Sequence, residues 1–351
     1  MKNLLVLSLC WLLSGIAFGQ DPQFSHFFSS GAYHNPAFVG ELGTLRTTTV
    51  HRSQWKNLAN INSTLFTLDG LFADDKVGLG VTVMHHSQDR WYKRTDLAVP
   101  IAFKIWGDTW NVSMAFQVGA SFKEFGGLGG LTLVDQYAAL NNGSFVANSN
   151  DPLASASLQD RYFSAGCGLL FDYFPQVGAS RWWLGVAAQQ GAYPLKNQSL
   201  SHPPRRWSAF RKSIHGGWQL HLKDTNGGHQ KTEQREETLS VMFNWRSQYG
   251  NQQLDLMAQY TYSPLLLQVG YRGLPLKKAG PYWQQDALMG SVGLRMGRVQ
   301  FVYTYDLTIS GLKGVGSHEI GFTIGLIEPL FKFGAKRDTP CEREDYFYAR
   351  F

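Results

Sequence analysis

The residues of this chain that could do chemistry are mainly histidines and cysteines, and none of them stands in a catalytic spacing. His85 and His86 are adjacent, and adjacent residues of a strand point to opposite faces, so they cannot ligate one metal from that strand. Cys167 and Cys341 are isolated and lack the spacing of a zinc site. No Gly-x-Ser-x-Gly, His-Glu-x-x-His or phosphate-binding loop occurs. The sequence therefore predicts no enzyme, no cofactor and no metal site.

The start of the chain indicates export. Lys2 provides a basic beginning, and residues 4–18 form an apolar run that is too short for a membrane-spanning helix. This pattern predicts a secretory signal peptide over 1–19. An oxidising compartment would allow Cys167 and Cys341 to pair, and the sequence leaves that disulfide open.

The elements available to position any site are short strands with two different faces. In residues 238–246, Leu239 and Val241 share an apolar face while Thr238 and Ser240 share a polar one. Such segments lie near 44–55, 62–72, 76–87, 92–105, 109–122, 161–173, 181–191, 212–223, 238–247, 252–262, 264–272, 285–296, 298–307 and 318–328. The apolar face often ends in Trp or Tyr, as at a bilayer interface, and the polar face carries mostly small, neutral residues.

After the signal peptide, no segment carries the roughly 18 apolar residues that a helical span needs. A membrane location would therefore require a closed barrel, because an open sheet leaves unpaired backbone groups in lipid. The sequence predicts an all-β fold, a transmembrane antiparallel β-barrel of about 14 strands (12–16), with an N-terminal segment that can enter the lumen.

The connections alternate in length, as in outer-membrane barrels. The long ones are 123–160, 192–211, 273–284 and 308–317, and the polar stretch 224–237 is an exception among the short turns. We expect a signal peptide over 1–19, a pre-barrel segment over 20–43, a barrel over 44–328 and a periplasmic tail over 329–351. An even strand count places both termini in the periplasm, with the barrel in the cell outer membrane.

The net charge of +6 would suit nucleic acid, but the export signal argues against that partner. A basic surface facing anionic lipid head groups is the better interpretation. The cluster of Arg205, Arg206, Arg211 and Lys212 around Trp207 fits either a strand rim near head groups or a solvated loop.

Five short segments near the two ends of the chain carry its identity. They are Asp21–Ser25, Asn35–Gly40, His51–Trp55, Tyr305–Leu312 and Gly316–Ile320. In this order, and at these distances from the ends, the set resembles the PorP/SprF family of Bacteroidota. Members of that family are described as outer-membrane barrel proteins of the type IX secretion system, some of them needed for gliding motility.

The first of these motifs also have a physical interpretation. Pro36 biases Asn35 away from helix and signals a turn, which can fold the N-terminal segment into the lumen or leave it as a periplasmic cap. Arg52 and Gln54 share one face of a strand, which suits the lumen, and Trp55 on the other face suits the bilayer interface.

The last hairpin holds the remaining candidates. Asp306, His318 and Glu319 flank its turn and can bond across the mouth of the hairpin, and Ser310 lies in the turn motif. Stabilisation of the hairpin is a simpler role for them than direct contact with a partner.

The resemblance implies a non-enzymatic component of the type IX secretion system that binds or anchors a secreted adhesin through its C-terminal targeting domain. Export, surface attachment or gliding motility would be the result. Its implied partners are outer-membrane lipid or lipopolysaccharide, the adhesin and other secretion-system subunits. The alternative is a FadL-like transporter of small hydrophobic molecules, a class that also has about fourteen strands and an N-terminal Asn-Pro-Ala segment.

Overall fold

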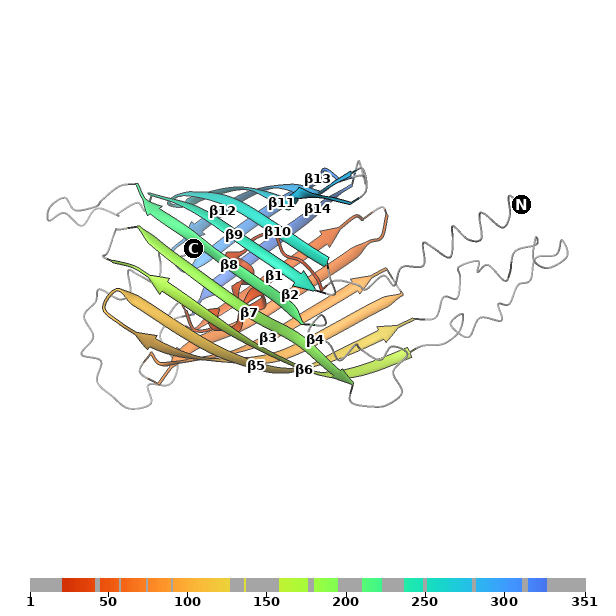
Figure 1. The fold of residues 1–351 in the computed structure, drawn as a ribbon, viewed down its shortest axis with the longest axis horizontal. Coiled ribbons are helices and arrows are strands. Elements are labelled where there is room, and N and C mark those ends of the chain that lie inside the picture. Colours follow the sequence, from red (N-terminus) through yellow and green to blue (C-terminus); the bar gives the residue numbers. More distant parts are fainter. Residues whose placement is uncertain are drawn as a thin grey trace.

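Neighbouring strands of the chain pair in sequence order, and the first strand also pairs with the last. The computed structural model contains fourteen antiparallel strands in one closed barrel (Figure 1). At the seam between the first and last strands, Arg46 is opposite Gly325 and Gln54 is opposite Ser317. The predicted antiparallel barrel of about 14 strands is confirmed.

The structure describes residues 21–41, 45–56, 58–73, 75–89, 91–126, 136, 158–175, 180–194, 210–222, 237–248, 251–279, 282–310 and 315–326. The strands are β1 (Arg46–Gln54), β2 (Ile61–Phe72), β3 (Val77–Gln88), β4 (Tyr92–Trp106), β5 (Trp110–Phe125), β6 (Leu158–Tyr173), β7 (Arg181–Pro194), β8 (Arg211–His221), β9 (Glu237–Gln248), β10 (Asn251–Tyr262), β11 (Leu265–Ala279), β12 (Tyr282–Met296), β13 (Val299–Thr308) and β14 (Gly316–Gly325). The expected signal peptide and the expected tail, with Cys341, lie outside these residues.

The two ends of the barrel differ. We call the end at which β1 begins and β14 ends the short-turn end, and the opposite end the long-loop end. The connections β5–β6 and β7–β8, which contain the expected long loops, lie at the long-loop end. The polar stretch between β8 and β9 lies at the short-turn end.

At the long-loop end several strands continue further than the alternation predicts. β5 continues to Phe125, β6 begins at Leu158, and β11 and β12 pair out to Ala279 and Tyr282. The expected loop 273–284 is therefore wrong, because most of it belongs to this extended hairpin. A strand that leaves the bilayer faces water on its outer side, so it loses the apolar alternation while its backbone pairing continues.

The two faces of the strands are sorted as predicted. Apolar side chains point outward, with Phe116 on β5 as much as 63% exposed, while Ser113 on the same strand is buried in the lumen. The adjacent histidines of β3 also separate, since the exposed His85 bonds Thr95 whereas His86 bonds the lumen residue Ser63. Cys167 is a free thiol on the outer face, which leaves its pairing with the tail untested.

One member of the expected basic cluster is not on the surface. Arg211, at the start of β8, is buried in the lumen, with 5% of its surface exposed, so it belongs neither to a lipid-facing rim nor to a solvated loop. Its neighbour Lys212 is half-buried. Adjacent strand residues point to opposite faces, and the sequence could not say which of the two faces inward. Arg205, Arg206 and Trp207 lie outside the described residues.

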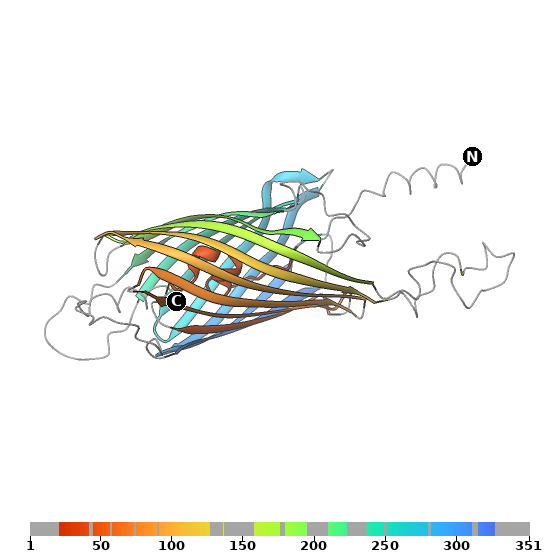
Figure 2. The ribbon, with the colours of Figure 1, turned by 90° about the horizontal axis from the view of Figure 1, so that it is seen from below.

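The lumen is occupied by the chain's own N-terminal segment. Residues 21–41, which we call the plug, hold the short helices η1 (Phe28–Ser30), α2 (Gly31–His34) and η2 (Pro36–Phe38), and nearly all of these residues are buried (Figure 2). The expectation that an N-terminal segment enters the lumen is met by the plug. No helix among the described residues is long and apolar enough to cross a membrane.

The outer face of β5 yields a first prediction. Phe116 lies at the middle of β5 and its side chain faces outward. Replacing it by Arg places a charge there, so the free energy of unfolding in lipid vesicles should fall by about 2–4 kcal/mol. Urea titration followed by tryptophan fluorescence measures this loss. Phe116→Leu is the control and should stay close to wild type. Equal stabilities of the Arg and Leu variants would show that this face does not contact hydrocarbon.

Candidate functional site

A buried arginine joins the first and last strands to the plug. The Arg52 guanidinium on β1 pairs with Asp306 on β13 at 2.6 Å and with Glu319 on β14 at 3.2 Å. It also donates to the Ser25 hydroxyl of the plug at 2.5 Å. All three charged side chains are almost completely buried. An isolated charge in such a place would be costly, so the pairing of these groups is what makes their burial possible.

The plug backbone completes this arrangement. The amide nitrogens of Ser25 and His26 donate to the two carboxylate oxygens of Glu319, at 2.7 and 2.8 Å. The Ser25 hydroxyl also donates to Asp306 at 2.7 Å. Charge-assisted bonds of this kind are shorter and stronger than neutral ones. The Glu319 carboxylate therefore holds main-chain amides of the plug, and these bonds do not depend on which side chain stands at position 26.

The charges continue across the lumen as a chain of ion pairs. Arg272 on β11 binds Asp306 at 2.9 Å and Asp255 on β10 at 3.0 Å. Arg246 on β9 binds the other oxygen of Asp255 at 2.8 Å. We call the six residues Arg52, Arg246, Arg272, Asp255, Asp306 and Glu319 the lumen charge network. It contacts the plug at Ser25, which also accepts from Arg272 at 3.0 Å.

A second contact fixes the middle of the plug. The Asn35 side-chain oxygen accepts from the Ala37 amide and caps η2, while its amide nitrogen donates to the Leu169 carbonyl of β6 at 2.9 Å. The same nitrogen lies 3.0 Å from the His215 ring of β8. Glycine at 168 is what allows this approach, because a Cβ there would collide with the Asn35 side chain.

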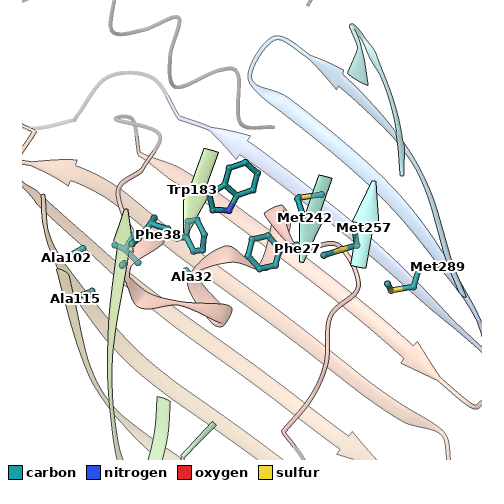
Figure 3. Packing of buried hydrophobic residues seen from close by; sticks show 12 residues of the cluster. Phe27, Ala32, Phe38, Ala102, Ala115, Trp183, Met242, Met257 and Met289 are labelled. Carbon is teal, nitrogen blue, oxygen red and sulfur yellow. The ribbon is translucent and has the colours of Figure 1, made fainter. Parts of the chain in front are cut away.

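Apolar side chains fill the space between the plug and the strands. Phe27, Phe38 and Val39 of the plug pack in a buried cluster with lumen-facing apolar residues of the barrel (Figure 3). The barrel residues of this cluster are Ala102, Ala115, Leu170, Trp183, Met242, Met257 and Met289. Burial of a Phe against such a surface typically contributes about 3–5 kcal/mol, judged by its truncation. The plug is therefore packed like a protein core.

The two ends of the plug are held at opposite ends of the barrel. At the long-loop end Asp21 pairs with Arg94, at the start of β4, at 2.5 Å and accepts from Gln248, at the end of β9, at 2.9 Å. At the short-turn end the Gly40 amide donates to Asp69 at 2.9 Å, and Asp69 also binds Arg46. Asp21 therefore lies at the long-loop end, whereas β1 begins and β14 ends at the short-turn end.

Burial and neighbouring charges determine the protonation states of two plug side chains, His26 and Asp21. Burial lowers the pKa of the His26 imidazole to about 4, so the ring is neutral at physiological pH and its Nδ1 accepts from the Ser29 amide at 3.2 Å. Burial alone would raise the pKa of Asp21, but Arg94 and Arg211 outweigh it and hold that pKa below its ordinary value. Asp21 is therefore ionised and able to pair with Arg94.

Comparison with known proteins assigns the family. Residues 16–324 match the PorP/SprF family, described as a type IX secretion system membrane protein. The chain belongs to this family. It is thus an outer-membrane component of the type IX secretion system, as the terminal motifs predict. No curated protein matches the sequence.

Several solved structures align with this chain at TM-scores below 0.5. CdiB from Acinetobacter baumannii has a TM-score of 0.44 at 6% identity, and the match covers 80% of this chain but only 59% of CdiB. The Pseudomonas putida toluene transporter TodX has a TM-score of 0.41 at 11% identity, covering 84% of this chain and 92% of TodX. The CymD monoaromatic hydrocarbon channel has a TM-score of 0.41 at 13% identity, covering 87% and 94%.

The PorP/SprF motifs of this chain meet in space. Asn35 and Pro36 are buried in the lumen as part of the plug. Arg52 of the His51–Trp55 motif contacts Asp306 and Glu319 of the C-terminal motifs, and all three contact Ser25 of the plug. The interpretation of Asn35-Pro36 as a periplasmic cap is wrong. Asp306 and Glu319 do not bond across a hairpin mouth, because both point into the lumen and meet through Arg52.

Four other expected residues lie away from this arrangement. His318 faces outward, where its ring lies 2.8 Å from the Tyr303 hydroxyl, so it does not join Asp306 or Glu319. Gln54 and Trp55 are half-buried at the long-loop end, and Trp55 begins the turn after β1 instead of ending that strand. Ser310 follows β13 in the connection to β14. Roles for these four residues stay predictions.

The sequence interpretation missed other residues that hold the plug, namely Ser25, His26, Asp255, Arg272 and His215. A signal for them was present on the polar faces of the strands. Met242, Met257 and Val302 interrupt those polar faces, and each is buried in the lumen. An apolar residue on the lumen side of a barrel strand indicates that something other than water lies against it.

Loss of the Arg52 side chain tests the lumen charge network. Arg52→Met leaves Asp306 and Glu319 without one of their counter-charges, so the barrel should lose about 3–5 kcal/mol of stability. The plug should also become sensitive to added protease, which mass spectrometry of the cleaved peptides would detect. Arg298→Met removes an exposed arginine and should change stability by less than about 0.5 kcal/mol. A protected plug in Arg52→Met would contradict the role of the network.

Proposed function

We propose that this PorP/SprF protein is a non-enzymatic partner of a secreted adhesin, which it holds at the outer membrane through the adhesin's C-terminal targeting domain. Surface attachment or gliding motility would follow from that hold. The long-loop end then faces the outside of the cell. The apolar outer face of the barrel contacts lipid and lipopolysaccharide. Other subunits of the secretion system dock at the short-turn end.

The plug is the observation that supports this proposal. It fills the lumen along the barrel axis, with Asp21 at one end and Gly40 at the other, and packs against strands all around it. A transporter would have to displace these contacts to open a path, including the bonds of Ser25 and His26 to Glu319. A protein that binds its partner at the rim and loops has no such requirement.

Locking the plug separates this function from FadL-like transport. Ser29 of the plug and Gly321 of β14 suit a disulfide, because a Cβ built on Gly321 lies 3.4 Å from the Ser29 Cβ. We expect the double variant Ser29→Cys/Gly321→Cys, in a chain with Cys167 and Cys341 replaced by Ser, to display adhesin normally when oxidised. Immunofluorescence of intact cells measures this display.

The same variant has a built-in control in its reduced state, and Ser29→Cys alone is the matched single variant. Adhesin display that is lost on oxidation and regained on reduction would show that the plug must leave for function. Uptake of a fatty acid or aromatic compound by the reduced but not the oxidised form would favour the transporter.

Co-purification tests the partner directly. A tagged protein extracted in mild detergent should bring down a large secreted protein in a stoichiometric amount, identified by mass spectrometry. The control is the same extraction from cells in which the candidate adhesin lacks its C-terminal domain. Normal surface display of that adhesin in cells without this barrel would refute the proposal.

A further inference from the structure

The contacts at the start of the plug show where it enters the barrel. Asp21 pairs with Arg94 near the start of β4 and accepts from Gln248 at the end of β9, and both of these positions lie at the long-loop end. The main-chain nitrogen of Asp21 also donates to the Gln248 side chain at 3.1 Å. The first described residue is therefore fixed at the long-loop end by its side chain and by its main chain.

Later residues of the plug lie closer to the short-turn end. Ser25 contacts Arg52, near the long-loop end of β1. Gly40 contacts Asp69, near the short-turn end of β2. The chain thus passes through the lumen once, from the long-loop end to the short-turn end, before β1 begins.

This passage changes the count that places the two ends of the chain. Fourteen strands, an even number, keep the start of β1 and the end of β14 at one end of the barrel. The plug adds one further crossing ahead of β1, so Asp21 and Leu326 are separated by an odd number of crossings. The expectation that both termini are periplasmic counted the strands alone.

The packing of the plug opposes a second passage of the chain through the lumen. Phe24 and Tyr33 of the plug pack against Val50, Leu65 and Met84 on β1, β2 and β3. The other apolar contacts of the plug are with β4 to β7, β9, β10 and β12. A lumen packed at this density on all these sides has no room for another length of backbone. The chain ahead of Asp21 therefore continues outward from the long-loop end.

We infer that the chain enters its own barrel from the side of the long loops, so that Asp21 and Leu326 face opposite sides of the membrane. With the long-loop end outside, as in the proposed function, the entry point at Asp21 faces the cell surface and adds to the surface that meets the adhesin. The shared side of Asp21 and the long loops rests on the path of the plug alone. Its identity as the cell surface rests on the proposed function.

A single cysteine inserted between Gln20 and Asp21 tests this path. The insertion is made in the full-length chain with Cys167 and Cys341 replaced by Ser. Intact cells are treated with a maleimide-linked polymer that is too large to cross the outer membrane, and labelling is measured as a shift in the gel mobility of the folded protein. We expect the inserted cysteine to be labelled in intact cells.

Two exposed positions serve as matched controls for the two ends of the barrel. Gln88→Cys lies at the end of β3, at the long-loop end, and Asp108→Cys lies between β4 and β5, at the short-turn end. The inserted cysteine should be labelled as fully as Gln88→Cys, whereas Asp108→Cys should be labelled only after the cells are permeabilised. If the cysteine variants do not fold, a FLAG epitope inserted at the same three places in the unaltered chain and detected with antibody gives the same comparison.

The outcomes separate this inference from the proposed function. Labelling of the inserted cysteine only after permeabilisation, as for Asp108→Cys, would overturn the inference and leave the proposed function standing. If intact cells instead label Asp108→Cys and protect both Gln88→Cys and the inserted cysteine, the orientation in the proposed function is wrong, and the shared side of Asp21 and the long loops stands.

Discussion

The pairing of Arg52 with Asp306 and Glu319 is the interaction on which the rest of the lumen depends. It joins the first strand to the last two and holds Ser25 of the plug between them. Without the plug, Glu319 would lose two main-chain donors while remaining in the lumen. Without the charges, the plug would lose its strongest directional contacts. Barrel closure and plug placement are therefore aspects of one set of bonds.

The barrel could be predicted from the sequence because lipid imposes a strict alternation. Val241 and Phe243 had to face outward, and Ser240 and Asn244 inward, so strand number and facing followed. The extension of β11 to Ala279 could not be predicted, since outside the bilayer nothing enforces the pattern. The alternation thus reports the hydrocarbon thickness and underestimates the length of the strands.

The candidate site was predicted only in part. Asn35, Arg52, Asp306 and Glu319 were singled out, but their common purpose was hidden because they lie far apart along the chain. Ion pairing between strands at opposite ends of the sequence follows from barrel closure, which brings Arg52 opposite Glu319 in the β1–β14 register. The partner of each charge is set by that register and by the position of the plug, and neither has a local sequence signal.

The seam between β1 and β14 has a consequence for the order of assembly. Strands formed by the two ends of the chain close the barrel around a segment that precedes both of them. A plug with Phe27 and Phe38 packed at mid-lumen reaches its place most directly while the seam is still open. The contacts of Ser25 and His26 with Glu319 span more than 290 residues, so they form only after β14 has been made. Folding of this barrel therefore ends with an early-made segment being enclosed by a late-made strand.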